Sequence, residues 1–277
     1  MKILNHPLFT LAIVVCIFIE YIISTRLKLD NYSRWEALSS LSILFMDRIL
    51  VYFFESDTTT LGTWLWNHRV LNLSFGRNLF ATFIAVEFVY YWAHRYNHRV
   101  SLGWASHSIH HTPTRFNLTM GYRLGLTRVI SFAWVLFLPL LLLGFHQADV
   151  TLIAGIIFLY QFFLHTELVP SLGFLEKIFN TPSNHRVHHG SDPKFYGKNL
   201  GGITLVFDHV FGTYRAEPKK IAMNYGLTAI VAKHSLVYEI FNYWALMFRA
   251  LRNAKHAFQW PGIVFGSPAR LIRQSRA

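Results

Sequence analysis

The 277-residue sequence contains a single cysteine, Cys16. One cysteine excludes an internal disulfide framework and every cysteine-based zinc or iron–sulfur site. Acidic residues are also scarce, with 14 Asp and Glu against 26 Lys and Arg. Calcium and magnesium prefer oxygen ligands, which such a chain supplies poorly. A transition-metal site in this protein must therefore be built mainly from its 15 histidines.

Linker sequences are missing as well. No internal repeat, low-complexity tract or Pro-, Gly- or Ser-rich linker interrupts the chain, so we treat it as one integrated unit. Within it we distinguish N-terminal membrane spans (1–78), a histidine-rich catalytic domain (79–217) and a basic amphipathic C-terminal region (218–277).

Apolar residues are abundant. They make up 53% of the chain, and aromatic residues 17%. This composition favours an all-α integral membrane protein over a soluble one. Five apolar runs of 15 to 18 residues are candidate spans: 8–24, 37–54, 79–93, 129–145 and 150–164. Because these runs are short, the alternative for the shortest is a buried core helix.

The ends of the spans predict an orientation. The first run contains Glu20 and lacks a small-residue cleavage site, so we expect it to be retained rather than removed as a signal peptide.

Residues 94–128 carry five Lys or Arg and no acid, and the region after Thr166 is also basic. The positive-inside rule places both stretches in the cytoplasm and the N-terminus outside. Such charge beside apolar spans fits an anionic lipid surface better than nucleic acid.

Nine histidines fall in positions with the spacing of metal ligands. Residues three or four apart share one face of a helix, so each cluster can aim its imidazoles at one point. The clusters lie in the sequences HRYNH, HSIHH and HRVHH, with one further histidine after FFL; they comprise His94, His98, His107, His110, His111, His165, His185, His188 and His189.

Their number and placement predict a two-metal site. Nine ligands exceed what a single structural zinc would use, whereas two ions with four or five nitrogens each would use them all. The third run ends at the first cluster, and the next two runs form an out-and-back hairpin that ends at His165. All nine histidines then meet at one membrane face. Two redox metals beside a membrane suggest O2 activation for attack on a lipid C–H bond.

Residues 87–217 resemble the fatty acid hydroxylase and sterol desaturase superfamily of membrane di-iron enzymes. The resemblance rests on the three boxes in order, the YYWAHR entry, HTPTRFNLTMGYR after the second box, and NTPSNHRVHHG followed by KNLGGITLVFDHVFGTY. The context of His165 and of the third box is most similar to the alkylglycerol monooxygenase branch and its bacterial relatives. Relatives in that branch often carry a histidine at the position of Asn184, so no ligand is expected there.

The resemblance implies a helical membrane fold, two histidine-ligated iron ions, and O2-dependent hydroxylation or desaturation of an alkylglycerol, a sterol or a fatty acyl chain. No haem-binding, flavin or nicotinamide motif is visible in the sequence. The expected electron source is thus a separate donor, with tetrahydrobiopterin implied by the same resemblance. The alternative is a non-catalytic membrane metal-binding or metal-transport protein, which would place ligands near mid-membrane.

Three further residues are site candidates. Glu87 shares a helical face with His94 and is expected to orient a ligand imidazole, the alternative being a structural hydrogen bond between helices. Asn117 and Arg123 follow the second box and could hold a polar headgroup or a cofactor; backbone capping and a lipid-phosphate contact are the alternatives.

Other polar residues are expected to be structural. This applies to His209, which follows Asp208 after a Gly-rich turn, and to the isolated histidines His6, His68, His146, His234 and His256. Glu20, Asp47 and Arg48 could pair across helices or line a substrate path. We expect residues 235–258 to form a helix that lies at the membrane interface or packs on the cytosolic body. The tail from Trp260 is expected to be loosely ordered.

Overall fold

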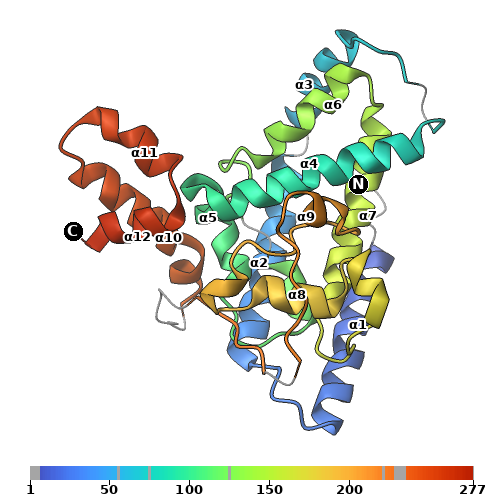
Figure 1. Cartoon of the computed structure of the whole chain (residues 1–277), viewed down its shortest axis with the longest axis vertical. Helices are drawn as coiled ribbons and strands as arrows, with labels where there is room; N and C mark the ends of the chain where they lie inside the picture. Colours follow the sequence, from blue (N-terminus) through green and yellow to red (C-terminus); the bar gives the residue numbers. More distant parts are fainter. Residues whose placement is uncertain are drawn as a thin grey trace.

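The computed structural model describes residues 7–54, 57–73, 76–123, 126–219, 222–227 and 235–276 (Figure 1). The described residues form α-helices and short 3-10 helices, with two isolated antiparallel bridges and no strands. The predicted all-α class is confirmed.

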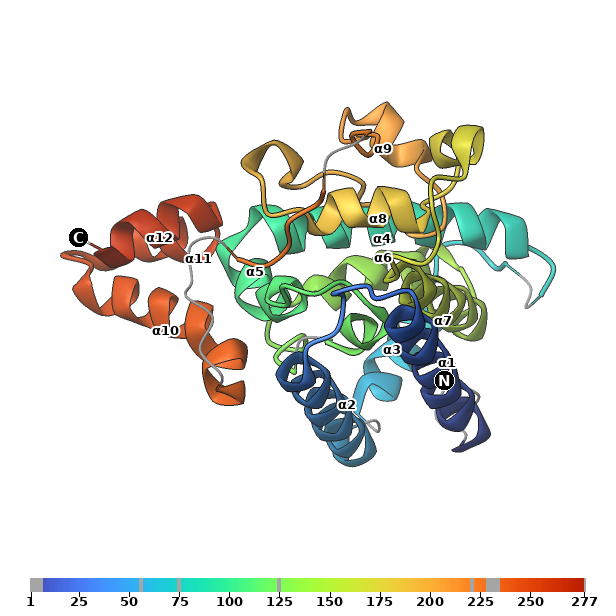
Figure 2. The ribbon, with the colours of Figure 1, turned by 90° about the horizontal axis from the view of Figure 1, so that it is seen from below.

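The N-terminal region consists of α1 (Pro7–Arg26), α2 (Arg34–Phe54) and α3 (Asp57–Asn67). Figure 2 shows α1 and α2 side by side at one face of the molecule. Large apolar side chains of both helices are exposed, among them Phe18 on α1 and Phe45 on α2, at 60% and 67%. Helices that show apolar side chains all around are suited to lipid rather than to water.

The centre of the molecule is a crossing of α4 (Leu79–Arg99) over α7 (Gln147–Leu164) (Figure 1). Val86 and Val89 of α4 pack on Ile153 and Ile157 of α7 in one buried cluster. Val100 adopts an extended conformation after α4 and turns the chain into α5 (Ser101–His107).

The run 129–145 differs from the expected full span. It folds as η3 (Ala133–Phe137) and α6 (Leu138–Leu143), together only 11 residues. Left-handed conformations at Phe132 and Gly144 end it on both sides, because such a residue cannot continue a right-handed helix. The expected hairpin thus has one long arm and one short arm.

Among the described residues, α7 is the one helix whose length and apolar composition suit a membrane crossing. Its 18 residues span about 27 Å at 1.5 Å per residue. The five crossings stay a prediction.

The histidine-rich part consists of short elements layered over α4 and α7. These are η1 (Ser108–His111), η2 (Leu118–Tyr122), η4 (Gly173–Lys177), α8 (Pro182–His189), η5 (Pro193–Phe195) and α9 (Val206–Val210). The start of α8 follows from its sequence: the Thr181 hydroxyl accepts from the Asn184 N–H, and Pro182 occupies the first turn.

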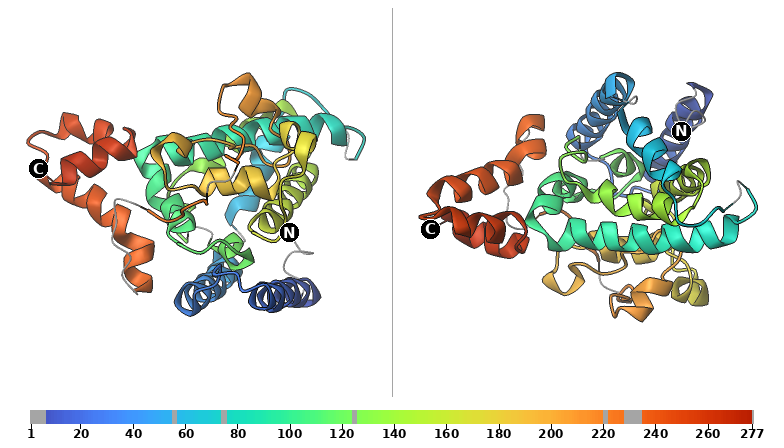
Figure 3. Two further views of the ribbon diagram at one scale, coloured as in Figure 1. Left: turned by 60° about the horizontal axis from the view of Figure 1, so that its bottom comes forward. Right: turned by 90° about the horizontal axis from the view of Figure 1, so that it is seen from above.

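The C-terminal region forms a helical arm. It comprises α10 (Leu236–Asn253), η6 (Ala257–Gln259), α11 (Trp260–Val264) and α12 (Pro268–Arg276), which contact the rest of the chain largely through α5 (Figure 3). Tyr243, Trp244 and Met247 of α10 pack with Leu102 and Ala105 of α5. The expected loosely ordered tail is wrong, because Leu271 of α12 is buried in the same cluster.

Candidate metal centre

The structure brings all nine predicted histidines together. The C-terminal half of α4 provides two, α5 and η1 provide three, the residue after α7 provides one and α8 provides three. The crossing of α4 and α7 fixes two of these sources, and α8 contacts α7. Four stretches between residues 94 and 189 thereby meet.

The nitrogens form two groups of four. The ligand atoms of each group lie within 4.8 Å of one another, and a further group of three joins them. The first group is His94, His98, His107 and His188, the second is His110, His165, His185 and His189, and the joining group is His111, His188 and His189. Each group of four could hold a metal ion, and the number of ions and their ligands stay a prediction.

Backbone carbonyls orient three of the rings. Nδ1 of His94 lies 3.0 Å from the Leu200 carbonyl, Nδ1 of His188 lies 2.9 Å from that of Lys198, and Nδ1 of His165 lies 2.8 Å from that of Gln161. A carbonyl only accepts, so each Nδ1 carries the proton and each Nε2 keeps its lone pair. This is the tautomer that a metal requires, fixed by an outer hydrogen bond.

The lone pairs point at each other rather than at protein donors. Nε2 of His165 lies 3.0 Å from that of His185 and 3.2 Å from that of His110. Nε2 of His94 and of His188 are buried without any hydrogen-bond partner. Buried polar atoms are normally paired, so converging unpaired imidazole nitrogens fit a metal ion.

Burial also keeps the imidazoles neutral. It lowers the pKa of His188 to about 4, against the opposing effect of its bond to the Lys198 carbonyl. Burial and the neighbouring His188 lower the pKa of His107 to about 3. Neutral histidine is the ligand form, so the site is arranged for metal rather than for a proton.

Glu87 does not touch a ligand histidine, so the expected contact with an imidazole is wrong. Its carboxylate accepts from the N–H groups of Ile203 and Thr204, at 2.8 and 2.9 Å, and from the Thr204 hydroxyl. The imidazole proton of His94 goes to the Leu200 carbonyl instead. Glu87 therefore fixes the loop that contains this carbonyl.

Asp208 holds the same loop from the other side. It accepts from the N–H groups of Leu200 and Gly201, at 2.8 and 2.7 Å, and from the Thr213 hydroxyl. These contacts give Asp208 a structural role, for which the sequence offered no prediction. Its closeness to His94 through Leu200 was not visible in the sequence, since the link runs through a main-chain peptide.

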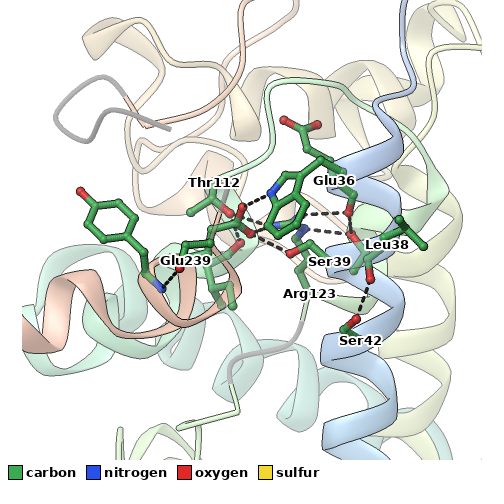
Figure 4. Close-up of polar contacts among 12 residues, drawn as sticks. Glu36, Leu38, Ser39, Ser42, Thr112, Arg123 and Glu239 are labelled. Carbon is green, nitrogen blue, oxygen red and sulfur yellow. Dashed lines mark hydrogen bonds and ion pairs between the residues drawn. The ribbon is translucent and has the colours of Figure 1, made fainter. Parts of the chain in front are cut away.

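Asn117 and Arg123 are committed to internal contacts. Asn117 caps η2 through Thr119 and donates to the Asn31 carbonyl at 2.6 Å. Arg123 is fully buried and donates to Ser40, Thr112, the Glu36 carbonyl and Glu239 (Figure 4). Neither side chain is free to hold a headgroup or a cofactor, which corrects that expectation for both.

Asn184, the position where relatives of this branch often carry a histidine, makes structural contacts through its amide nitrogen. Its amide donates to the Glu176 and Phe179 carbonyls and so ties α8 to the preceding turn.

The isolated polar residues lie outside the two groups. The rings of His68, His146, His209 and His256 contact Trp64, Ala148, the Lys177 carbonyl and Phe258. His6 and His234 lie outside the described residues.

The acids of the first two helices have local or nearby partners. Asp47 pairs with its neighbour Arg48 and with Arg128. Glu20 accepts from Tyr32, Leu118 and Thr166.

Comparison with known proteins identifies the domain. Residues 79–213 match the fatty acid hydroxylase family model. The chain is 37% identical over 215 residues to alkylglycerol monooxygenase of Homo sapiens, covering 76% of this chain and 47% of that protein. It is 31% identical over 247 residues to the Caenorhabditis elegans protein of the same name, covering 85% of this chain and 47% of that protein.

A bacterial relative matches at a lower level. The ornithine lipid hydroxylase of Rhizobium tropici is 27% identical over 150 residues, 54% of this chain and 45% of that protein. The chain thus spans about half the length of the curated relatives that it matches. No solved structure matches.

Proposed function

The chain belongs to the fatty acid hydroxylase family, and we propose that it is a membrane-bound di-iron monooxygenase that uses O2 to hydroxylate a lipid. The observation that carries the proposal is the division of the histidines, seven of them buried and two half-buried, into two groups of four that are joined through His111. A second candidate reaction at the same centre is desaturation.

Two iron ions in these groups would supply the O2 activation that attack on an unreactive C–H bond requires. The protein's own contribution is preparation of the site. The carbonyls of Lys198 and Leu200 hold two rings with their Nε2 atoms inward, and Glu87 and Asp208 hold the loop. Burial excludes water and keeps the imidazoles neutral.

The balance of the reaction requires an electron donor. Hydroxylation places one oxygen atom of O2 in the C–H bond and reduces the other to water, which consumes two electrons and two protons. We propose that these electrons come from a separate donor, for which tetrahydrobiopterin is the candidate that the resemblance to the alkylglycerol monooxygenase branch implies.

The substrate is a lipid that reaches the centre from the bilayer. The exposed apolar side chains of α1, α2 and α7 support membrane association. The basic stretches that flank the boxes support an anionic lipid surface on the cytoplasmic side. Alkylglycerols are favoured by the name of the human relative, and ornithine lipids by that of the bacterial one.

Metal analysis with an oxygen assay tests the proposal. The purified protein in detergent should hold about two iron ions per chain and convert lipid only in the presence of O2. His188 belongs to both the first and the joining group, so His188→Ala should lose metal as well as turnover. His256→Ala is the control. Metal that is bound but never supports O2-dependent turnover would favour the metal-transport alternative.

A further inference from the structure

A cavity of about 570 Å³ lies beside the histidine cluster, between the start of α2, the segment after η1 and the start of α10. Thr112 lines it and directly follows His111. Tyr225 also lines it and stacks on Phe116 with ring centroids 4.9 Å apart. Phe116 in turn packs on His189 at 5.5 Å. One aromatic ring therefore separates the cavity from the metal centre.

The charged lining of this cavity is unusual for the chain. It contains three carboxylates and two guanidinium groups, whereas the whole protein carries a net charge of +12. Asp30 pairs with Arg115 and Glu239 with Arg123, both at 2.6 Å. The third carboxylate belongs to Glu36. It accepts hydrogen bonds from the backbone N–H and hydroxyl of Thr114 and from the backbone N–H of Arg115, all of which are neutral groups.

The Glu36 charge is thus left without a cation. Within the part of the chain that the structure describes, no Lys or Arg side chain makes an ion pair with it. Figure 4 shows Glu36 at the start of α2, near the Arg123–Glu239 pair. A partly buried carboxylate with no counter-ion attracts a cationic ligand.

Two further features indicate the kind of cation. Asn242 lines the cavity, is 6% exposed, and leaves its Oδ1 without a hydrogen-bond partner. This buried acceptor needs an N–H or O–H donor. The aromatic side chains of Tyr32, Trp35 and Tyr225 are also part of the lining, and aromatic faces attract ammonium groups.

We propose that this cavity binds an ammonium group that carries N–H protons. Glu36 supplies the opposite charge, the aromatic lining supplies cation–π attraction, and Asn242 supplies a hydrogen-bond acceptor. The site is distinct from the histidine cluster and is separated from it by Phe116.

A lipid headgroup fits this site better than a free amine. Trp35 lines the cavity, and Leu38, Leu41 and Phe45 continue from it along α2 at helical spacing. These three side chains are 63%, 41% and 67% exposed. An amphiphile could thus place its ammonium group in the cavity and its chain along α2. The inference that an amine-headed lipid is the substrate rests on the proposed hydroxylase function. The inference that the cavity binds such a lipid does not.

Calorimetric titration of the full-length protein in neutral detergent tests the site without turnover. The probes are dihexanoyl phosphatidylethanolamine, phosphatidylglycerol and phosphatidylcholine, which share their chains and differ in their headgroups. We expect phosphatidylethanolamine to bind at least about tenfold more tightly than phosphatidylglycerol. Non-specific attraction to a protein of charge +12 would give the opposite order, and that result would overturn the proposal.

Two variants assign the binding to named groups. Glu36→Gln should weaken phosphatidylethanolamine binding about tenfold and leave phosphatidylglycerol unchanged. Asp192→Asn, at an exposed carboxylate paired with Lys194, is the matched control. Asn242→Ala should reduce the preference for phosphatidylethanolamine over phosphatidylcholine, because the quaternary headgroup has no N–H. Thermal melting confirms that each variant is folded.

Free ethanolamine distinguishes the source of the ammonium group. If free ethanolamine binds much more weakly than phosphatidylethanolamine, the site is one for a lipid headgroup. If the two bind equally, the site is one for a soluble amine. If the folded Glu36→Gln variant and the wild type bind phosphatidylethanolamine equally, the proposal of an ammonium site is wrong. Metal content and O2-dependent turnover are separate measurements, so a failure of the hydroxylase proposal would be recognised independently.

Discussion

Leu200 serves the metal centre through its main chain alone. Its carbonyl accepts from Nδ1 of His94, and its N–H donates to Asp208. The ring orientation of a ligand thus depends on the placement of a single peptide. A substitution that shifts this loop should disturb metal binding without touching a histidine.

Gly202 gives a direct test of that dependence. A Cβ at this position would lie 2.4 Å from Oε1 of Glu87 and 2.9 Å from Ile157. Gly202→Ala should therefore push the loop away from Glu87, lower the metal content and reduce thermal stability by about 1–3 kcal/mol. Gly262→Ala, where the nearest atoms are those of the Arg270 side chain at 3.6 Å or more, is the control. Equal metal content in both variants would show that the loop does not orient His94.

The buried histidines also predict an acid-sensitive fold. Histidine titrates near 6.5 in an unfolded chain, whereas burial lowers the pKa of His188 to about 4 and that of His107 to about 3. Below pH 6.5 these histidines bind protons in the unfolded chain but stay neutral in the folded protein. Each such histidine then costs about 1.4 kcal/mol of stability per pH unit until its folded pKa is reached.

Thermal melts of the metal-free protein between about pH 7 and pH 5 measure this slope. Stability should fall throughout the interval, and His107→Gln should make the fall shallower. His256→Ala should leave the slope unchanged. A flat profile would mean that the histidines are accessible to protons in the folded state.

The residues of the site could be predicted from the sequence where a short-range pattern marks them. Spacings of three and four residues were enough to find eight of the histidines, and His165 was found from its place at the end of an apolar run. Most partners of Glu87, Asn117 and Arg123 were not predictable, because they lie 83 to 117 residues away in sequence and several are backbone groups. A sequence pattern shows which side chains share a face but not what that face meets.

Among the elements, the apolar runs illustrate the same limit. The run 150–164 became α7, but the equally apolar run 129–145 became two short pieces. Composition alone does not reveal the left-handed turn at Phe132, which is not a residue that favours such a conformation. For the C-terminal tail, the buried position of Leu271 depends on α10 and α11 and could not be read from α12 alone.

The arm provides a prediction at this scale. Leu271 is 1% exposed in the cluster that joins α10, α11, α12 and α5. Leu271→Ala should cost about 2–5 kcal/mol, as core truncations do. Phe258→Ala, at a side chain that is 78% exposed, should cost much less. Denaturation midpoints in detergent compare the two, and similar values would indicate that the arm is not packed on α5.

For the whole molecule, α7 predicts the placement of its two ends. Gln147 begins this helix, and its last turn leads into His165. Gln147→Cys and Asp192→Cys, each in a Cys16→Ala background, should react with an impermeant maleimide from opposite sides of the membrane. We expect residue 147 to be labelled in intact cells and residue 192 only after permeabilisation. Labelling of both from one side would mean that α7 does not cross.

The joining of distant segments by histidine has a consequence for mechanical integrity. An ion in the first group would tie residue 94 to residue 188 and so close a long chain loop, as a disulfide does elsewhere. This chain has one cysteine and no such covalent tie. The ions would then act as its cross-links, because binding free energy at ligands that only the fold brings together is folding free energy. Chelation should thus raise the protease sensitivity of the segment between the second and third boxes, and unchanged digestion would limit the ions to a chemical role.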